Sequence, residues 1–191
     1  MNQGKIIFIS GPSGVGKGTL ISELKLKHQD WIFPPSCTTR DPRPGEVEGE
    51  TYYFVSKEEF QKKIDDGEFL EWANVHNQNF YGTLKSPLLD GVKKGRIVVR
   101  EFDVQGFLSA REALPKDHFI SIFLKPAESV EDLMERVRAR APISDDEVTR
   151  RIESIKKELE TSKFYDFEII SVGGEIQQMV DDAEKIIAEN T

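Results

Sequence analysis

Apolar and polar positions follow two periods along the chain, one typical of strands and the other of helices. KIIFIS (5–10), RIVVREFD (96–103) and HFISIFLK (118–125) are short runs rich in apolar and β-branched residues, as expected of buried parallel strands. FEIISV (167–172) is a fourth such run, and an amphipathic helix is expected over 175–190. Strands that alternate with helices predict an α/β fold with a parallel sheet and helices on both faces.

Helical periodicity marks the segments between these strands. Apolar residues recur at three- and four-residue steps from Lys17 to His28, and helices are also expected over 87–95, 129–141 and 145–166. Ser129 is placed to cap the third of these helices. The last of them is predicted to be long and charged.

The stretch from 31 to 82 interrupts this rhythm and predicts an inserted unit that covers part of the core. Prolines break up its first half. TYYFVS (51–56) and FLEWANV (69–75) predict strands, and the polar segment between them predicts a helix that ends near Gly67.

Composition narrows the classes of function. The chain has 191 residues, a formal net charge of −8 and one cysteine, Cys37. The acidity argues against general attraction to nucleic acid or to an anionic membrane surface. No apolar run approaches the roughly 18 residues that a membrane span needs, and the N-terminus has no cleavable leader pattern. We therefore expect a soluble cytoplasmic protein of one compact domain with insertions.

A glycine-rich stretch, GPSGVGKGT, follows the first predicted strand and opens the first predicted helix. In this context the loop can turn its backbone N–H groups inward and, with the positive end of the helix, cradle a phosphate. Lys17 supplies a cation that can follow a phosphoryl group during transfer. The predicted ATP-binding residues are Gly11, Pro12, Ser13, Gly14, Val15, Gly16, Lys17, Gly18 and Thr19.

The loop departs from the usual phosphate-loop pattern, because Gly18 stands where a Ser or Thr normally ligates Mg²⁺. The hydroxyl arrives one place later, as Thr19. A GKGT ending resembles adenylate kinases, which favours phosphoryl transfer between small molecules. Mg²⁺ is then expected to keep most of its waters, with Thr19 and, through water, Glu101 as the candidate metal contacts.

A second phosphate site is predicted in SCTTRDPRPGEVEGETYYFVS (36–56). Arg40 and Arg43 lie on a proline-stiffened segment that precedes Tyr52. Two guanidinium groups can grip a terminal phosphate with bidentate hydrogen bonds, and a phenol can add another. An ordinary solvated loop would carry the same residues, but a phosphate loop in the same chain favours the second site.

TTRDPRPGEVEG, YYFVS, FLEWA, FYGT and DVQG occur in the order and at the spacing of guanylate kinases, and the chain resembles that family over essentially its whole length. The resemblance implies a P-loop kinase that transfers the ATP γ-phosphoryl group to GMP and dGMP in purine nucleotide metabolism, with Mg²⁺. It implies a core P-loop domain of residues 1–33, 84–125 and 158–191. A mixed α+β GMP-binding insertion would span 34–83 and a small helical lid 126–157.

The resemblance also assigns the GMP site. The implied phosphate contacts are Arg40, Arg43, Tyr52 and Tyr81, and the implied guanine contacts are Ser36, Glu71, Thr83 and Asp103. Glu71 has an independent physical reason. The N1–H and 2-amino groups of guanine are donors that one carboxylate can accept together, whereas adenine N1 is an acceptor and would leave the carboxylate unpaired.

Arginines gather in the expected lid. The resemblance matches three of them to groups that meet the ATP phosphates, namely Arg136, Arg140 and Arg151. With Lys17 they are the predicted catalytic residues, because phosphoryl transfer needs charge neutralisation and alignment. The alternative is a solvated helix face whose arginines pair with acids four residues away, such as Glu147.

Several positions depart from the family pattern on the ATP and metal side. An E-F-D ending at 101–103 replaces the usual D-I-D, and Arg100 stands before it, where a buried strand normally carries an apolar residue. Ala141 replaces a lid glycine, and the V-N-D turn beside the adenine is Ser171-Val172-Gly173 here, which loses the amide. Reduced turnover or altered donor preference is the expected consequence. Whether Arg100 pairs with an acid or reaches substrate stays open.

Two other functions remain as alternatives. One is a kinase of another small phosphate, such as a ribose bisphosphate; the other is a catalytically impaired guanylate-kinase-like binding module. The guanine set argues against the first and the phosphate loop against the second. The expected partners are ATP and GMP or dGMP, with no nucleic acid or membrane, and the expected assembly is a monomer or small homo-oligomer.

Overall fold

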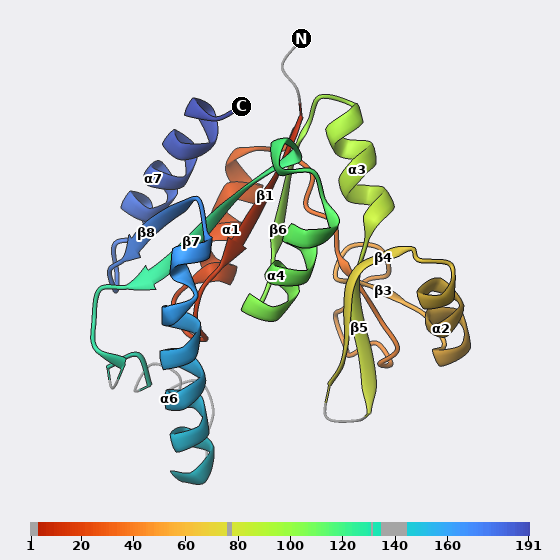
Figure 1. Ribbon diagram of the computed structural model, residues 1–191, viewed down its shortest axis with the longest axis horizontal. Helices are drawn as coiled ribbons and strands as arrows, with labels where there is room; N and C mark the ends of the chain where they lie inside the picture. The colour runs from red at the N-terminus through yellow and green to blue at the C-terminus, as the bar shows by residue number, and fades with distance from the viewer. Residues whose placement is uncertain (1–3, 76–77, 131, 135–144) are drawn as a thin grey trace.

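The core of the protein is a parallel sheet of four strands in the order β6-β1-β7-β8, seen at the centre of Figure 1. The computed structural model describes residues 4–75, 78–130, 132–134 and 145–191. The core strands are β1 Lys5–Ser10, β6 Ile97–Glu101, β7 Phe119–Pro126 and β8 Phe167–Ser171. The predicted parallel sheet is confirmed.

Helices cover both faces of this sheet (Figure 1). They are α1 Lys17–Lys27 and α7 Ile176–Glu189 on one face, and α3 Lys85–Lys93 and α4 Val104–Ala113 on the other. Side chains alternate along β1, so Ile7 and Ile9 pack with α1 and α7 while Ile6 and Phe8 pack with α3 and α4. All four are completely buried, which is why this strand is apolar at every central position.

A second, mixed sheet in the order β3-β2-β5-β4 lies beside the core. Its strands are β2 Ser36–Thr38, β3 Tyr52–Phe54, β4 Phe69–Val75 and β5 Asn79–Leu84, and its helix is α2 Lys57–Asp65. The helix packs Phe60 against Phe69 and the buried, free Cys37. This small apolar cluster is separate from the two clusters of the core sheet.

The strand predicted over 96–103 is shorter than expected, because the chain turns into a helix that the periodicity did not predict. β6 ends at Glu101, and Asp103 caps α4 by accepting a hydrogen bond from the Gly106 N–H at 2.7 Å. The cap places Asp103 at the junction of the strand and the helix. A predicted site residue therefore also begins a helix.

The helix predicted over 145–166 also ends early. α6 spans Asp145–Glu160, and a short 3₁₀ turn, Ser162–Phe164, follows it. Tyr165 then stacks on Phe107 of α4, with ring centroids 3.9 Å apart, which ties the chain to the core before β8 begins. Tertiary packing thus ends this helix where the charge pattern alone continued it.

Ser129 caps a helical segment as predicted. Its Oγ accepts a hydrogen bond from the Asp132 N–H at 3.1 Å and donates one to the Asp132 carboxylate at 2.8 Å. Residues 130 and 132–134 are helical. The remainder of the helix predicted over 129–141 lies outside the described residues.

Candidate functional site

The glycine-rich loop joins β1 to α1 and leaves the start of that helix open. Gly14 and Gly16 adopt φ of 87° and 109°, a left-handed region that residues with a side chain rarely enter. Gly16 is the N-cap of α1 and supplies no capping side chain. The first N–H groups of the helix therefore remain available to an anion.

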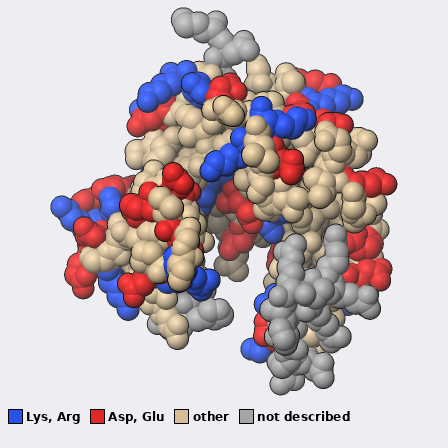
Figure 2. Space-filling view, turned by 180° about the vertical axis from the view of Figure 1, so that it is seen from behind, with Lys and Arg blue, Asp and Glu red and all other residues tan. Residues whose placement is uncertain are grey.

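A cavity of about 450 Å³ lies over this loop. It is lined by Ser13, Gly14, Gly16, Lys17, Gly18, Thr19 and Glu101. Two further predicted residues, Gly11 and Pro12, present their carbonyl groups to Lys17, and Val15 is buried. Figure 2 shows the molecular surface hollowed near its centre, with acidic side chains in the hollow.

Lys17 is held inside the loop. Its Nζ donates to the Gly11 carbonyl at 2.6 Å and to the Pro12 carbonyl at 3.2 Å, and lies 3.9 Å from Glu101 Oε1. Burial lowers the pKa of the Lys17 ammonium, while the charges of Glu101, Glu158 and Asp103 raise it. An incoming phosphate would supply a closer anion and favour the charged form.

Thr19 and Glu101 both line the cavity over the loop and present oxygen atoms, the ligand type that Mg²⁺ prefers. Within the part of the chain that the structure describes, no group of three or more His, Cys, Asp or Glu is placed to hold a metal. The residues present fit an ion held mainly by nucleotide phosphates and water.

A second cavity, of about 390 Å³, opens between the mixed sheet and the end of β6. Five of the predicted GMP contacts line it: Ser36, Tyr52, Glu71, Tyr81 and Asp103. Thr83 lies behind this wall and is 1% exposed. Glu101 lines both cavities, so the cradle over the loop and the second cavity meet at this residue.

Glu71 is the half-buried carboxylate of the second cavity. It lies opposite Thr83 in the β4–β5 ladder. Burial raises the pKa of Glu71, whereas hydrogen bonding to Thr83 and the charge of Arg100 lower it, and Asp103 raises it. The charge of the Glu71 carboxylate, which is a hydrogen-bond acceptor, therefore depends on Thr83, Arg100 and Asp103.

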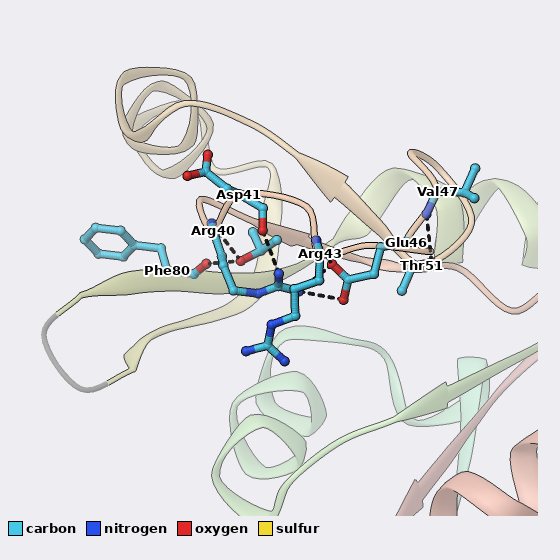
Figure 3. A network of polar contacts seen from close by, with 8 residues as sticks. Arg40, Asp41, Arg43, Glu46, Val47, Thr51 and Phe80 are labelled. Carbon is cyan, nitrogen blue, oxygen red and sulfur yellow. Dashed lines mark hydrogen bonds and ion pairs between the residues drawn. The ribbon is translucent and has the colours of Figure 1, made fainter.

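Arg40 and Arg43 belong to a network around Glu46, which the sequence did not single out (Figure 3). Arg40 Nη2 donates to both Glu46 oxygens at 2.8 and 2.9 Å, and the Arg43 backbone N–H donates to the same carboxylate at 2.7 Å. The Arg40 hydrogen bond and the Arg43 N–H lower the pKa of Glu46. In Figure 3 the Arg43 side chain extends away from these contacts.

The Arg40 guanidinium also lies 5.5 Å from the ring centre of Tyr52, so two predicted phosphate contacts are neighbours. Tyr52 and Tyr81 lie edge to face, with centroids 6.0 Å apart. The structure therefore brings Arg40, Tyr52 and Tyr81 together. The sequence signal that could have identified Glu46 was its position three residues after Arg43, because a carboxylate there can pair with Arg40 or with Arg43.

The sequence left the role of Arg100 open. Its side chain lines the second cavity and hydrogen-bonds to Ser36, Thr83 and the Pro34 carbonyl. These hydrogen bonds all go to neutral oxygens, and whether Arg100 also reaches substrate stays open.

The predicted lid arginines Arg136 and Arg140, with Ala141, lie outside the described residues. Arg151 lies on α6, where its Nη2 and Nε donate to Glu147 Oε1 at 2.7 and 3.0 Å. This is the pair four residues apart that the alternative interpretation expects. The role of Arg151 at ATP stays a prediction.

Ser171 supports the loop from the end of β8. Its buried Oγ donates to the Val15 carbonyl at 2.6 Å. A small cavity of about 140 Å³ lies beside this contact, between the loop and α7. Val172 and Ile176 line it and are 41% and 42% exposed, so it offers an apolar surface next to the phosphate cradle.

Comparison with known proteins gives one consistent result. Residues 3–190 match the family model described as guanylate kinase. Guanylate kinase of Synechococcus sp. is 42% identical over 166 residues, which is 87% of this chain and 88% of the relative. Guanylate kinase of Clostridium tetani is 39% identical over 188 residues, 98% of this chain and 87% of the relative.

A solved structure agrees with these sequences. The crystal structure of guanylate kinase from Anaplasma phagocytophilum superimposes with a TM-score of 0.73 at 32% identity, covering 100% of this chain and 88% of that one. Among the described residues, no helix has the length and apolarity needed to cross a membrane.

Proposed function

The chain belongs to the guanylate kinase family and transfers the γ-phosphoryl group of ATP to GMP, and we propose that its two adjoining cavities hold the two substrates of that reaction. The observation that supports this assignment is the shared wall at Glu101. Donor phosphates over the loop would thus adjoin an acceptor in the second cavity. Family membership disfavours the ribose bisphosphate kinase and the binding module.

The second cavity fits GMP. Glu71 would accept from guanine N1–H and the 2-amino group, with Thr83, Ser36 and Asp103 around the base. Tyr52 and Tyr81 would donate to the phosphate from the opposite end. Arg40 would exchange Glu46 for the phosphate, a stronger and divalent partner, and the Arg43 guanidinium, which extends away from Glu46 in Figure 3, would join it there.

Transfer needs alignment more than covalent help. An anionic oxygen of the GMP phosphate would attack the γ-phosphorus in line, and the bond from that phosphorus to the β–γ bridging oxygen would break, leaving ADP. No general base is required, because the attacking oxygen is already anionic. Lys17 and the N–H groups at the start of α1 would hold the charge on the transferred group.

Mg²⁺ belongs with ATP in this proposal, and when bound it would neutralise phosphate charge and orient the donor. Thr19 and Glu101 are the residues that would hold it, largely through water. The apolar surface at Val172 and Ile176 would take the ATP base. The arginines of the predicted lid, Arg136, Arg140 and Arg151, would close over the phosphates.

Replacing Glu71 with Gln tests the assignment of the second cavity. Glu71→Gln turns one acceptor oxygen into a donor that faces the donors of guanine, so kcat/KM for GMP should fall by about 100-fold or more. The KM for ATP should change little, because Glu71 does not line the loop cavity. A coupled ADP-release assay with ATP and Mg²⁺ measures both constants.

Glu68→Gln is the matched control for this test. Glu68 is 44% exposed and pairs with Lys63 just before β4. Its replacement should leave both constants unchanged. Equal kinetics for Glu71→Gln and the wild type would overturn the placement of guanine beside Glu71.

Several finer points extend the proposal. Use of dGMP is expected, because the predicted contacts to the base and phosphate do not involve the ribose. The division into a core of 1–33, 84–125 and 158–191, an insertion of 34–83 and a lid of 126–157 agrees with the two separate sheets. A cytoplasmic location and a monomer or small homo-oligomer stay predictions, and so does the absence of a nucleic-acid partner.

A further inference from the structure

Arg100 places a cation in the wall of the second cavity, between buried apolar residues of β6 and the mixed sheet. Val98 and Val99 precede it and are buried. Arg100 Nη1 donates to the Pro34 carbonyl at 3.0 Å, and Nε and Nη2 donate to Thr83 Oγ1 at 3.3 and 3.1 Å. Nη2 also donates to Ser36 Oγ. One side chain therefore ties β6 to two strands of the mixed sheet.

These contacts determine which way two hydroxyl groups point. A guanidinium has donors only and accepts nothing. Ser36 Oγ and Thr83 Oγ1 must therefore act as acceptors toward Arg100, and each keeps its own proton for another partner. A hydroxyl without such a donor can rotate and offer either a lone pair or a proton.

Glu71 is the acceptor placed to take the Thr83 proton, because the two residues lie opposite each other in the β4–β5 ladder. Hydrogen bonding from the Thr83 side chain is one of the effects that lower the pKa of Glu71. Arg100 donates to Thr83, and Thr83 would in turn donate to Glu71, so the three residues would form a chain of donors. The chain ends at the carboxylate that accepts from the base under the proposed function.

The Ser36 hydroxyl likewise keeps its proton for a partner other than Arg100. Ser36 lines the cavity together with Glu71. Guanine presents an acceptor, O6, where adenine presents an amino donor. A Ser36 hydroxyl that can only donate would form a hydrogen bond to guanine O6. The same hydroxyl would face the amino group of adenine with two donors and no acceptor between them.

We propose that Arg100 is a positioning residue for base recognition, which orients the Ser36 hydroxyl as a donor and supports Glu71 as an acceptor. This inference rests on the proposed function of the second cavity. It assigns to Arg100 a part in selecting a 6-oxo-2-aminopurine over a 6-aminopurine. Arg100 itself touches neither reacting atom.

The electrostatic surroundings of Glu71 make this role visible in a pH profile. Three groups face it: Thr83 from β5, Arg100 from β6 and Asp103 from the start of α4. Arg100 is the cation among them. Without it the pKa of Glu71 should rise further, so Glu71 should lose its charge at a higher pH during acidification.

The test compares Arg100→Met, Arg100→Lys and the control Arg96→Met by calorimetric titration with GMP from pH 5.5 to 8. Arg100→Met keeps the length of the side chain without charge or donors. Arg100→Lys keeps the charge without the planar fork. Arg96 stands just before β6, donates to the Asp30 carbonyl and does not line the cavity.

The expected results separate the two effects of Arg100. Arg100→Met should raise the Kd of GMP by about 10- to 100-fold at neutral pH, because two hydroxyls lose their donor and the Glu71 carboxylate loses a neighbouring positive charge. The ratio of its Kd to that of the wild type should grow as the pH falls. The GMP phosphate itself titrates near pH 6, and this ratio removes its contribution. Arg100→Lys should keep the ratio flat while the Kd stays raised.

A double-mutant cycle tests the route through Ser36. Ser36→Ala should weaken GMP binding in the wild type and cost clearly less in the Arg100→Met background, because the hydroxyl is already free to rotate there. Fully additive effects would overturn this route. Thermal unfolding of each variant shows whether the fold is retained.

Other outcomes would also reject the proposal. An Arg100→Met variant that binds GMP like Arg96→Met, at every pH, would show that Arg100 has no part in base recognition. Arg100→Met could instead lose affinity for ATP and for GMP equally, with a lower Tm and with a pH dependence of GMP binding like that of the wild type. That result would show that Arg100 has a structural role only. GMP binding is read without transfer, so a wild type that bound GMP but released no ADP would count against the proposed function alone.

Discussion

Single residues decide whether the phosphate loop works in its unusual form. Gly18 is the second residue of α1, and a Cβ built on it meets no atom within 4 Å. Close packing therefore does not require a glycine here, in contrast to Gly106, where an added Cβ would lie 3.0 Å from Phe102. The missing hydroxyl is a property of the metal side of the site and has no steric cause.

Gly18→Ser should accordingly fold and add a hydroxyl beside Thr19 and Glu101. We expect the Mg²⁺ concentration for half-maximal activity to fall by about tenfold, at the lower end of what changes around a metal produce. A Mg²⁺ titration of ADP release at fixed ATP and GMP measures it. Gly18→Ala is the matched control, since both replacements raise helix propensity and only Ser adds a ligand. An equal shift in both variants would contradict the metal explanation.

At the residue scale, the sequence predicted the groups that its motifs mark and missed those that only packing brings in. Glu71 was identified because its position carries the family pattern, and it lines the expected cavity. The Glu46 contact to Arg40 depends on how the loop folds back. The three partners of Arg100 come from segments more than 15 residues away, which no local pattern joins.

Helices, like single residues, could be predicted from the sequence where their start and end signals are local. α2 carries its own start signal, a capping box in which Ser56 Oγ accepts from the Glu59 N–H at 3.1 Å and Glu59 Oε2 accepts from the Ser56 N–H at 2.9 Å. Its end is equally local, since Gly67 adopts φ of 66°. α4 was missed, and its N-cap, Asp103, was assigned to the end of the preceding strand.

Ser56→Ala should therefore destabilise the protein by about 1 kcal/mol through the loss of this cap. The corresponding fall in Tm is roughly 2 to 4 °C for a chain of this length. Ser109→Ala is the control: Ser109 lies inside α4 and donates to the Gln105 carbonyl at 3.2 Å, a contact that adds little to a helix. Calorimetric unfolding compares the two variants, and equal Tm values would show that the cap does not hold the mixed sheet.

The part of the chain that the structure describes forms two sheets, which border two adjoining cavities. The core sheet supplies the phosphate loop and Glu101, while the mixed sheet supplies Glu71 and Ser36. Arg100 joins the two by bonding from β6 to Thr83 and Ser36. Each substrate should therefore stabilise the fold through a different sheet.

Thermal unfolding with one substrate at a time can separate these contributions. A ligand at 100 times its Kd adds about 2.7 kcal/mol to the free energy of unfolding. This should raise Tm by roughly 5 to 10 °C for GMP alone and for ATP with Mg²⁺ alone. In Glu71→Gln the GMP shift should disappear while the ATP shift persists, because the two cavities meet only at Glu101 among their described lining residues. Loss of both shifts in this variant would mean that the cavities are not separate binding sites, and that the core and the mixed sheet respond to substrate as a single unit.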